Sequence, residues 1–151
     1  MTNLLTQSDI THDDLIKAGV NWFKKDLKSK VILSESRGFG GEIPDIIAWK
    51  SGYSFLIECK ASRSDFLADK KKSFRQSGGM GHYRLYLCPT GLIKPEELPI
   101  GWGLLYFDGK KVNRVVCWEG NIFSVVKCIN QFKPDYKNEV RLLSSFVRRL
   151  N

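Results

Sequence analysis

Apolar residues recur at helical spacing between Thr11 and Ser29, and lysines fill the opposite face. The apolar positions are Leu15, Trp22, Phe23 and Leu27. Thr11 is followed three residues later by Asp14, which is the arrangement of a capping box at a helix start. The pattern predicts a first helix from Thr11 to Ser29, after a loose lead-in.

Three short apolar runs then favour β-strands, because they are bounded by turn residues and rich in branched side chains. They are Val31–Leu33, Asp45–Trp49 and Ser54–Lys60. The second and third runs are apolar on both faces over most of their length, which predicts central strands. A glycine-rich turn, Arg37–Gly41, separates the first run from the second.

A basic helix is predicted next, from Ser64 to about Gln76, with an apolar inner face. The inner positions are Phe66, Leu67 and Phe74. The helix ends at a glycine-rich break, and a fourth strand, Tyr83–Cys88, follows it.

The pattern of apolar residues in the last part of the chain predicts a hairpin and a final helix. The hairpin pairs Leu104–Phe107 with Val112–Trp118 across an Asp-Gly turn. The segment from Asn121 to Asn130 fits either a helix or a strand. The final helix follows Pro134 and carries its apolar residues on one face, at Val140, Leu143, Phe146, Val147 and Leu150.

The predicted order is therefore α-β-β-β-α-β followed by β-β-α, which indicates an α/β or α+β fold. The 151 residues have the size of one domain, so we expect a single domain over residues 1–151. Hydrophobic residues make up 42% and charged residues 26%, a globular composition that argues against disorder and against a coiled coil.

Charge adds information about partners. Lysine and arginine outnumber the acids by 24 to 16, giving a formal net charge of +8. This excess favours a polyanionic partner, nucleic acid before an anionic membrane, although a basic domain without such a partner gives the same count.

No stretch reaches the roughly 20 apolar residues of a membrane helix. The four cysteines lack CxxC spacing, which disfavours structural zinc, and the N-terminus lacks a secretion signal. We expect a cytoplasmic protein with free thiols and no membrane partner.

Two short strings, Pro44-Asp45 and Glu58-Cys59-Lys60, place charged residues at the ends of the central strands. A tight turn at Ser51-Gly52 sets a register in which Asp45 lies directly opposite Glu58. Opposed residues have Cβ atoms about 4.5–5.5 Å apart on one face, and Lys60, two residues after Glu58, shares that face. Two carboxylates and an ammonium are therefore predicted to converge.

A cation explains this arrangement, because like charges directly opposite each other destabilise a sheet. Oxygen donors without histidine or thiolate favour Mg²⁺ or Mn²⁺. The metal ligands we expect are Asp45, Glu58 and the backbone carbonyl of Cys59, whose side chain faces the core instead. In the alternative, Asp45 only caps a turn and Glu58 and Lys60 form an edge ion pair. The buried apolar run before Lys60 argues against that, since unpaired charge there costs several kcal/mol.

These residues resemble a known family. Pro44-Asp45 followed by Glu58-Cys59-Lys60 is similar to the motif of the PD-(D/E)xK nuclease superfamily, which includes restriction, homing and repair enzymes. The order of elements from Thr11 to Cys88 also resembles its shared restriction-endonuclease-like αβββαβ core, to which this chain adds a C-terminal β-hairpin and helix. The string from Glu58 to Phe66 further resembles MmcB-type DNA-repair proteins.

The resemblance implies a metal-dependent DNA endonuclease that hydrolyses phosphodiester bonds with a metal-activated water. Asp45 and Glu58 would hold the metal, and Lys60 would position or activate the water. Many relatives add an upstream acid, for which Glu35 is the candidate and Glu42 and Asp14 are alternatives. The other functions that remain open are a non-catalytic DNA-binding module on the same fold and a structure-specific repair or recombination nuclease.

Basic residues just after the motif are candidates for contact with DNA phosphates, although a lysine run is more commonly a solvated helix face. They are Arg63, Lys70, Lys71, Lys72 and Arg75. Because one site per chain cuts one strand, we expect a homodimer or a higher homo-oligomer for cutting both strands.

Overall fold

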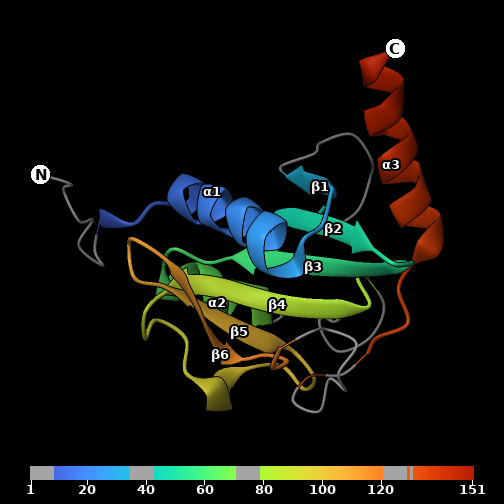
Figure 1. The fold of residues 1–151 in the computed structure, drawn as a ribbon. Helices are drawn as coiled ribbons and strands as arrows, with labels where there is room; N and C mark the ends of the chain where they lie inside the picture. The colour runs from blue at the N-terminus through green and yellow to red at the C-terminus, as the bar shows by residue number, and fades with distance from the viewer. Residues whose placement is uncertain (1–8, 35–42, 71–78, 121–128, 130) are drawn as a thin grey trace, which may run out of the picture.

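A computed structural model of the chain describes residues 9–34, 43–70, 79–120, 129 and 131–151 (Figure 1). The glycine-rich turn predicted at Arg37–Gly41 lies outside the described residues. So do the end of the predicted basic helix and nearly all of the ambiguous segment, residues 121–128 and 130.

The first helix begins where its capping pattern predicts. The Thr11 hydroxyl accepts a hydrogen bond from the Asp14 N–H, and the Asp14 carboxylate accepts one from the Thr11 N–H. Helix α1 spans His12–Trp22 and continues as a π-helix over Phe23–Leu27. It ends at Lys28, whose φ of 58° is left-handed. The predicted helix is therefore confirmed, with its last turn widened.

Six strands form one mixed sheet in the order of the chain. They are β1 Val31–Ser34, β2 Ile46–Lys50, β3 Tyr53–Cys59, β4 Tyr83–Pro89, β5 Gly103–Phe107 and β6 Val112–Val116. The pairs β1–β2, β2–β3 and β5–β6 are antiparallel, while β3–β4 and β4–β5 are parallel. The mixed sheet and its covering helices confirm the α/β class, and β2 and β3 are internal strands as predicted.

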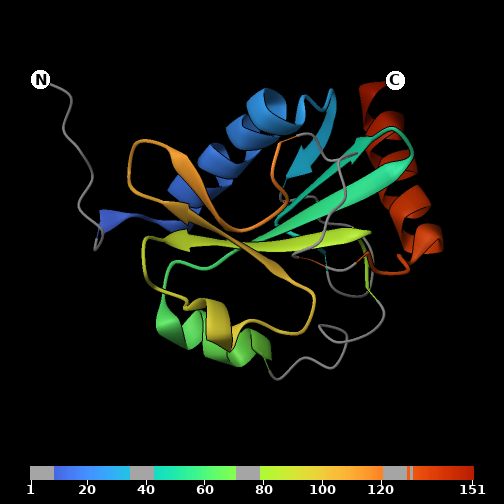
Figure 2. The same cartoon turned by 60° about the horizontal axis from the view of Figure 1, so that its bottom comes forward.

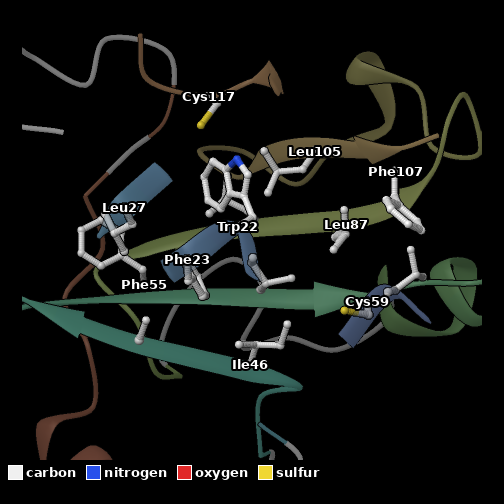
Figure 3. Packing of buried hydrophobic residues seen from close by; sticks show 14 of the residues in the cluster. Trp22, Phe23, Leu27, Ile46, Phe55, Cys59, Leu87, Leu105, Phe107 and Cys117 are labelled. Carbon is white, nitrogen blue, oxygen red and sulfur yellow. The ribbon is translucent and has the colours of Figure 1, made fainter. Parts of the chain in front are cut away.

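Helices cover both faces of the sheet (Figure 2). Helix α1 packs on one face, where Trp22, Phe23 and Leu27 meet apolar side chains of the strands (Figure 3). A Cβ added at Gly19 would come within 2.5 Å of the Ile46 Cδ1 atom, so glycine allows α1 to approach β2 closely.

Helix α2, Arg63–Lys70, and a short 3₁₀ helix, Pro95–Glu97, lie on the other face. The core there includes Phe66, which is fully buried. The prediction that Leu67 also faces inward is wrong, because its side chain is 48% exposed. The buried residues of α2 are Phe66 and Asp69, one turn apart, and Leu67 lies on a different side of the helix.

The last helix, α3, spans Tyr136–Leu150 and projects at one end of the sheet (Figure 1). Its predicted apolar face is largely exposed, with Val140 at 59% and Leu150 at 73%. The helix packs instead through Leu142 and through Glu139, which is 2% exposed. Within the described parts of the chain, no helix is both long enough and apolar enough to cross a bilayer.

Candidate active site

The register between β2 and β3 brings the two predicted acids together. Lys50 pairs with Tyr53 around a turn in which Ser51 and Gly52 both have positive φ, and the ladder continues to Ile46 opposite Ile57. One further residue along each strand places Asp45 opposite Glu58. The predicted register is thus confirmed as far as the ladder extends.

Asp45 is fixed at this position by two contacts. Its Oδ2 atom accepts a hydrogen bond of 2.8 Å from the Cys59 N–H, which ties the start of β2 to the end of β3. The same oxygen lies 3.3 Å from the Nε2 atom of His12, in the first turn of α1. Asp45 therefore joins three elements, and its side chain is 23% exposed.

Lys60 sits on a rigid backbone, because its N–H donates to the Leu87 carbonyl at 2.9 Å and extends the pairing of β3 with β4. Its ammonium lies 3.2 Å from the Oδ1 atom of Asp69 on α2. The other carboxylate oxygen of Asp69 accepts a hydrogen bond from the Tyr86 hydroxyl of β4. Asp69 and Tyr86 are both buried, so the position of the ammonium is strongly constrained.

An open pocket of about 340 Å³ gathers these groups at the carboxyl end of β3. Its lining includes Asp45, Glu58, Lys60, His12 and Asp69. Glu58 is only 3% exposed, and its carboxylate belongs to the same sheet face as Lys60. The Cys59 side chain is 2% exposed and packs in the core on the face of α1, as predicted (Figure 3).

The predicted Mg²⁺ or Mn²⁺ requires oxygen donors that converge in this pocket. In the part of the chain that the structure describes, no group of three or more His, Cys, Asp or Glu side chains is arranged to hold a metal ion. Two carboxylates do converge, and the Cys59 carbonyl projects to the same side of β3 as its N–H, toward Asp45. Mg²⁺ commonly takes one or two carboxylates and completes its shell with water and substrate phosphate, so this donor set fits it.

The residues predicted to contact DNA are only partly described. Arg63 forms a bidentate pair with Glu97, both distances being 2.7 Å, and also donates to the Leu92 carbonyl. This pair raises the pKa of Arg63 and lowers that of Glu97 to about 2. Arg63 therefore anchors α2 to the connection between β4 and β5. Lys70 is exposed, and its ammonium lies 5.5 Å from the ring centre of Phe66. Lys71, Lys72 and Arg75 lie outside the described residues.

The upstream acid is not fixed by the structure, because Glu35 and Glu42 lie outside the described residues. Asp14, the third alternative, is engaged in the capping box, and its hydrogen bonds with Thr11 lower its pKa. It does not line the pocket that contains Asp45 and Glu58.

Three residues of the pocket region were not predicted from the sequence: His12, Asp69 and Tyr86. His12 is the first residue of a capped helix and Tyr86 lies in an apolar strand, so neither has a local signal for chemistry. Asp69 has a faint one, since an acid three residues after Phe66 falls on the buried side of the helix.

Comparison with known proteins adds a fold relationship. The chain matches no protein-family model, and no curated protein matches it. Among solved structures it is similar to a protein of unknown function from Silicibacter pomeroyi, with 20% sequence identity and a TM-score of 0.60. The match covers 94% of this chain and 90% of that chain. At this identity the likeness shows a shared fold.

Proposed function

We propose that this chain is a metal-dependent DNA endonuclease built on a restriction-endonuclease-like core. The observation that carries the proposal is the convergence of Asp45, Glu58 and Lys60 in one pocket at the ends of two adjacent internal strands. Two acids and a lysine in this arrangement suit hydrolysis of a phosphodiester, in which negative charge develops on phosphate and leaving oxygens.

The order of elements supports the proposal. Helix α1, strands β1 to β3, helix α2 and strand β4 follow the αβββαβ order of the core that the sequence resembles. Strands β5 and β6 and helix α3 extend this core at its far edge and one end. The site lies where α1, β2, β3 and α2 meet, so all its side chains come from the core.

In the proposed mechanism, Asp45, Glu58 and the Cys59 carbonyl would hold Mg²⁺ or Mn²⁺. The bound cation would polarise the scissile phosphate and stabilise charge on the leaving oxygen. The hydrogen bond from the Cys59 N–H keeps Asp45 aimed at the pocket before substrate arrives. Preorganised side chains of this kind need no rearrangement in the transition state.

Lys60 supplies a positive charge beside the scissile phosphate and positions the attacking water, with a 5′-phosphate as the expected product. Asp69 and Tyr86 act as positioning residues, because the Asp69 carboxylate pairs with the Lys60 ammonium and the Tyr86 hydroxyl donates to that carboxylate. The +8 charge of the chain would attract DNA at low salt.

One observation favours a second function, a DNA-binding module without turnover. Among the described residues no three-ligand metal cluster is found, and the Lys60 ammonium is already ion-paired with Asp69. A module of this kind would bind DNA through its basic surface and show no dependence on Mg²⁺. It is therefore distinguished from the nuclease by the absence of turnover and of any dependence on Mg²⁺.

The test is incubation of the purified protein with supercoiled plasmid, linear duplex, single-stranded and branched DNA, each with Mg²⁺, Mn²⁺ or EDTA. We expect cleavage that requires the cation and disappears in Asp45→Asn and Glu58→Gln. The matched control is Glu96→Gln, which removes an exposed carboxylate away from the pocket.

Preferential cutting of branched DNA would assign the chain to the repair or recombination type. Binding without cleavage of any substrate in either cation would exclude the nuclease and leave the binding module. Equal cleavage of both strands at one position would support the proposed homodimer, which light scattering of the purified protein measures directly.

A further inference from the structure

A second concavity, of about 450 Å³, lies between α1 and the β5–β6 hairpin, on the opposite face of the sheet from α2 (Figure 2). Helix α1 contributes Lys17 and Asn21, and the π-helix that continues it contributes Lys25. All three are exposed and follow one another at four-residue intervals. The hairpin contributes Lys110, Lys111 and Val112. We call this concavity the lysine groove.

The charge of the lysine groove is only partly balanced by the protein. Asp26, one of its two acids, pairs with Arg114 at 3.7 Å, and Asp14, the other, serves the helix cap. Lys17 lies 3.6 Å from Asp13 in an exposed pair, which contributes little. Within the described residues, Lys25, Lys110 and Lys111 form no ion pair. Backbone hydrogen bonds from Lys111 and Lys110 lower the pKa of Asp108 in the hairpin turn, and the charge of Lys111 adds to that lowering. Four exposed lysines therefore face a concave surface with little opposing charge.

The groove opens at the same end of the sheet as the candidate active site. Strands β3, β4 and β5 are parallel, so their carboxyl ends share one edge. Glu58 and Lys60 lie at that end of β3, and the hairpin turn with Lys110 follows that end of β5, two strands or about 10 Å away. The first turn of α1 connects the two, since His12 lines the active-site pocket and Asp14 lines the groove.

We propose that the lysine groove binds the phosphodiester backbone of the DNA whose scissile phosphate lies at Asp45, Glu58 and Lys60. The inference rests on the proposed nuclease function. It adds the surface that binds the DNA flanking the scissile phosphate. This surface differs from the basic helix expected from the sequence, because it lies on the opposite face of the sheet.

The lining of the groove favours a nucleic-acid backbone over a small phosphorylated ligand. Its floor includes Trp22 and Phe107, which are 4% and 8% exposed, so their rings offer no face for a base to stack on. Lysine is a flexible point charge that contacts phosphates without reading bases. Lysines spaced along a helix and across a hairpin match a ligand with repeated negative charges.

The experiment measures affinity for a duplex oligonucleotide by fluorescence anisotropy across a range of salt concentrations, in EDTA so that cleavage does not consume the DNA. The variants are Lys17→Gln/Lys25→Gln and Lys110→Gln/Lys111→Gln. The matched control is Lys133→Gln/Lys137→Gln, which removes the same charge from exposed positions near the start of α3. Melting temperatures of all variants confirm that the substitutions leave folding intact.

Each phosphate contact adds about 0.9 to the slope of log K against log salt, so each groove pair should lower the slope by up to about 1.8. The control pair should lower it much less. Equal slopes for groove and control pairs, or wild type that binds no DNA, would overturn the proposal. Displacement of the DNA by low concentrations of a mononucleotide would overturn it too, in favour of a nucleotide site.

The outcome is separate from that of the nuclease proposal. Groove variants that lose DNA affinity, with no cleavage by wild type in Mg²⁺ or Mn²⁺, would refute the nuclease and retain the groove. Cleavage by wild type, with unchanged DNA affinity in the groove variants, would retain the nuclease and refute the groove.

Discussion

At the scale of single residues, Lys60 combines a proposed chemical role with a structural one. Its ammonium is only partly accessible, and the buried carboxylate of Asp69 depends on it for a counter-charge. Removing Lys60 therefore leaves a buried charge without this partner, which destabilises a protein more than the pair stabilises it. Loss of activity in a Lys60 variant has to be separated from loss of folding.

Asp69→Asn should lower the free energy of unfolding by about 1–3 kcal/mol, because it removes the charge of a buried ion pair and leaves a single oxygen to accept from Tyr86 or Lys60. Tyr86→Phe should cost less, about 1 kcal/mol, since it removes the hydroxyl alone. Urea unfolding curves measure both, with the exposed Glu96→Gln as control. Unfolding of Asp69→Asn at the wild-type midpoint would show that the pair contributes nothing.

Asp45 and Glu58 predict a linkage between metal and stability. Wild type should melt at a higher temperature with Mn²⁺ than with EDTA, because only the folded chain presents the two carboxylates together. The stabilisation is about 2.7 kcal/mol at a hundredfold excess over Kd. In Asp45→Asn the two melting curves should converge, and relief of repulsion of roughly 0.2–1 kcal/mol should stabilise the metal-free variant slightly. A metal shift of equal size in both proteins would place the cation elsewhere.

The predicted positions of Asp45 and Glu58 were correct because they depend on a turn that the sequence itself reveals. Ser51 and Gly52 define a two-residue turn, and a two-residue turn fixes the register of both strands as far as Asp45 and Glu58. His12 and Asp69 reach the site from helices, and their distance from Asp45 and Lys60 depends on tertiary packing. Periodicity along the sequence contains no information about that packing.

At the scale of elements, α3 is held by a buried polar network rather than by its apolar face. Glu139 accepts hydrogen bonds from the Trp49 indole N–H at 3.1 Å, from the Ser54 hydroxyl at 2.9 Å and from the Gly81 N–H at 2.8 Å. The sequence could not reveal this docking, because a glutamate among arginines and apolar residues in a helix is typical of an exposed position. The buried side of α3 is set by partners on β2, β3 and the start of β4.

His82 connects α3 to the sheet and makes this docking sensitive to pH. The Ser54 N–H donates to the His82 Nδ1 atom at 2.9 Å, so Nδ1 is unprotonated, and Nε2 contacts the Tyr136 hydroxyl at 2.8 Å. Burial lowers the pKa of His82. The charge of Glu139 opposes this shift, and the charge of Arg84 adds to it. The folded state therefore favours the neutral ring.

A lowered histidine pKa means that its contribution to stability is complete above about pH 6.5 and is lost as pH falls toward the folded-state pKa. We expect the free energy of unfolding to decrease below pH 6.5 with a slope of at most about 1.4 kcal/mol per pH unit from this group. His82→Gln should flatten the slope, because it removes the group whose pKa burial lowers. A slope unchanged by His82→Gln would show that His82 does not cause the pH dependence of stability.

At the scale of the whole molecule, the candidate site and the docking of α3 lie at opposite ends of the sheet. The carboxyl ends of β3, β4 and β5 carry the candidate site and the lysine groove, while the network that docks α3 lies at the opposite end of β3 and β4. The order of elements was predictable, because each has a strong local pattern. The groove was not, because it joins α1 to a hairpin about 90 residues later in the chain.

The central claim is that Asp45, Glu58 and Lys60 perform chemistry on DNA rather than only bind it. The most direct measurement is the single-turnover cleavage rate in Mg²⁺ or Mn²⁺, together with DNA affinity in EDTA, for wild type, Asp45→Asn and Glu96→Gln. We expect Asp45→Asn to keep its affinity for DNA while its cleavage rate falls by orders of magnitude. We expect Glu96→Gln to cut DNA at the wild-type rate. Cleavage by Asp45→Asn at the wild-type rate, or no cleavage by wild type in either cation, would contradict the account.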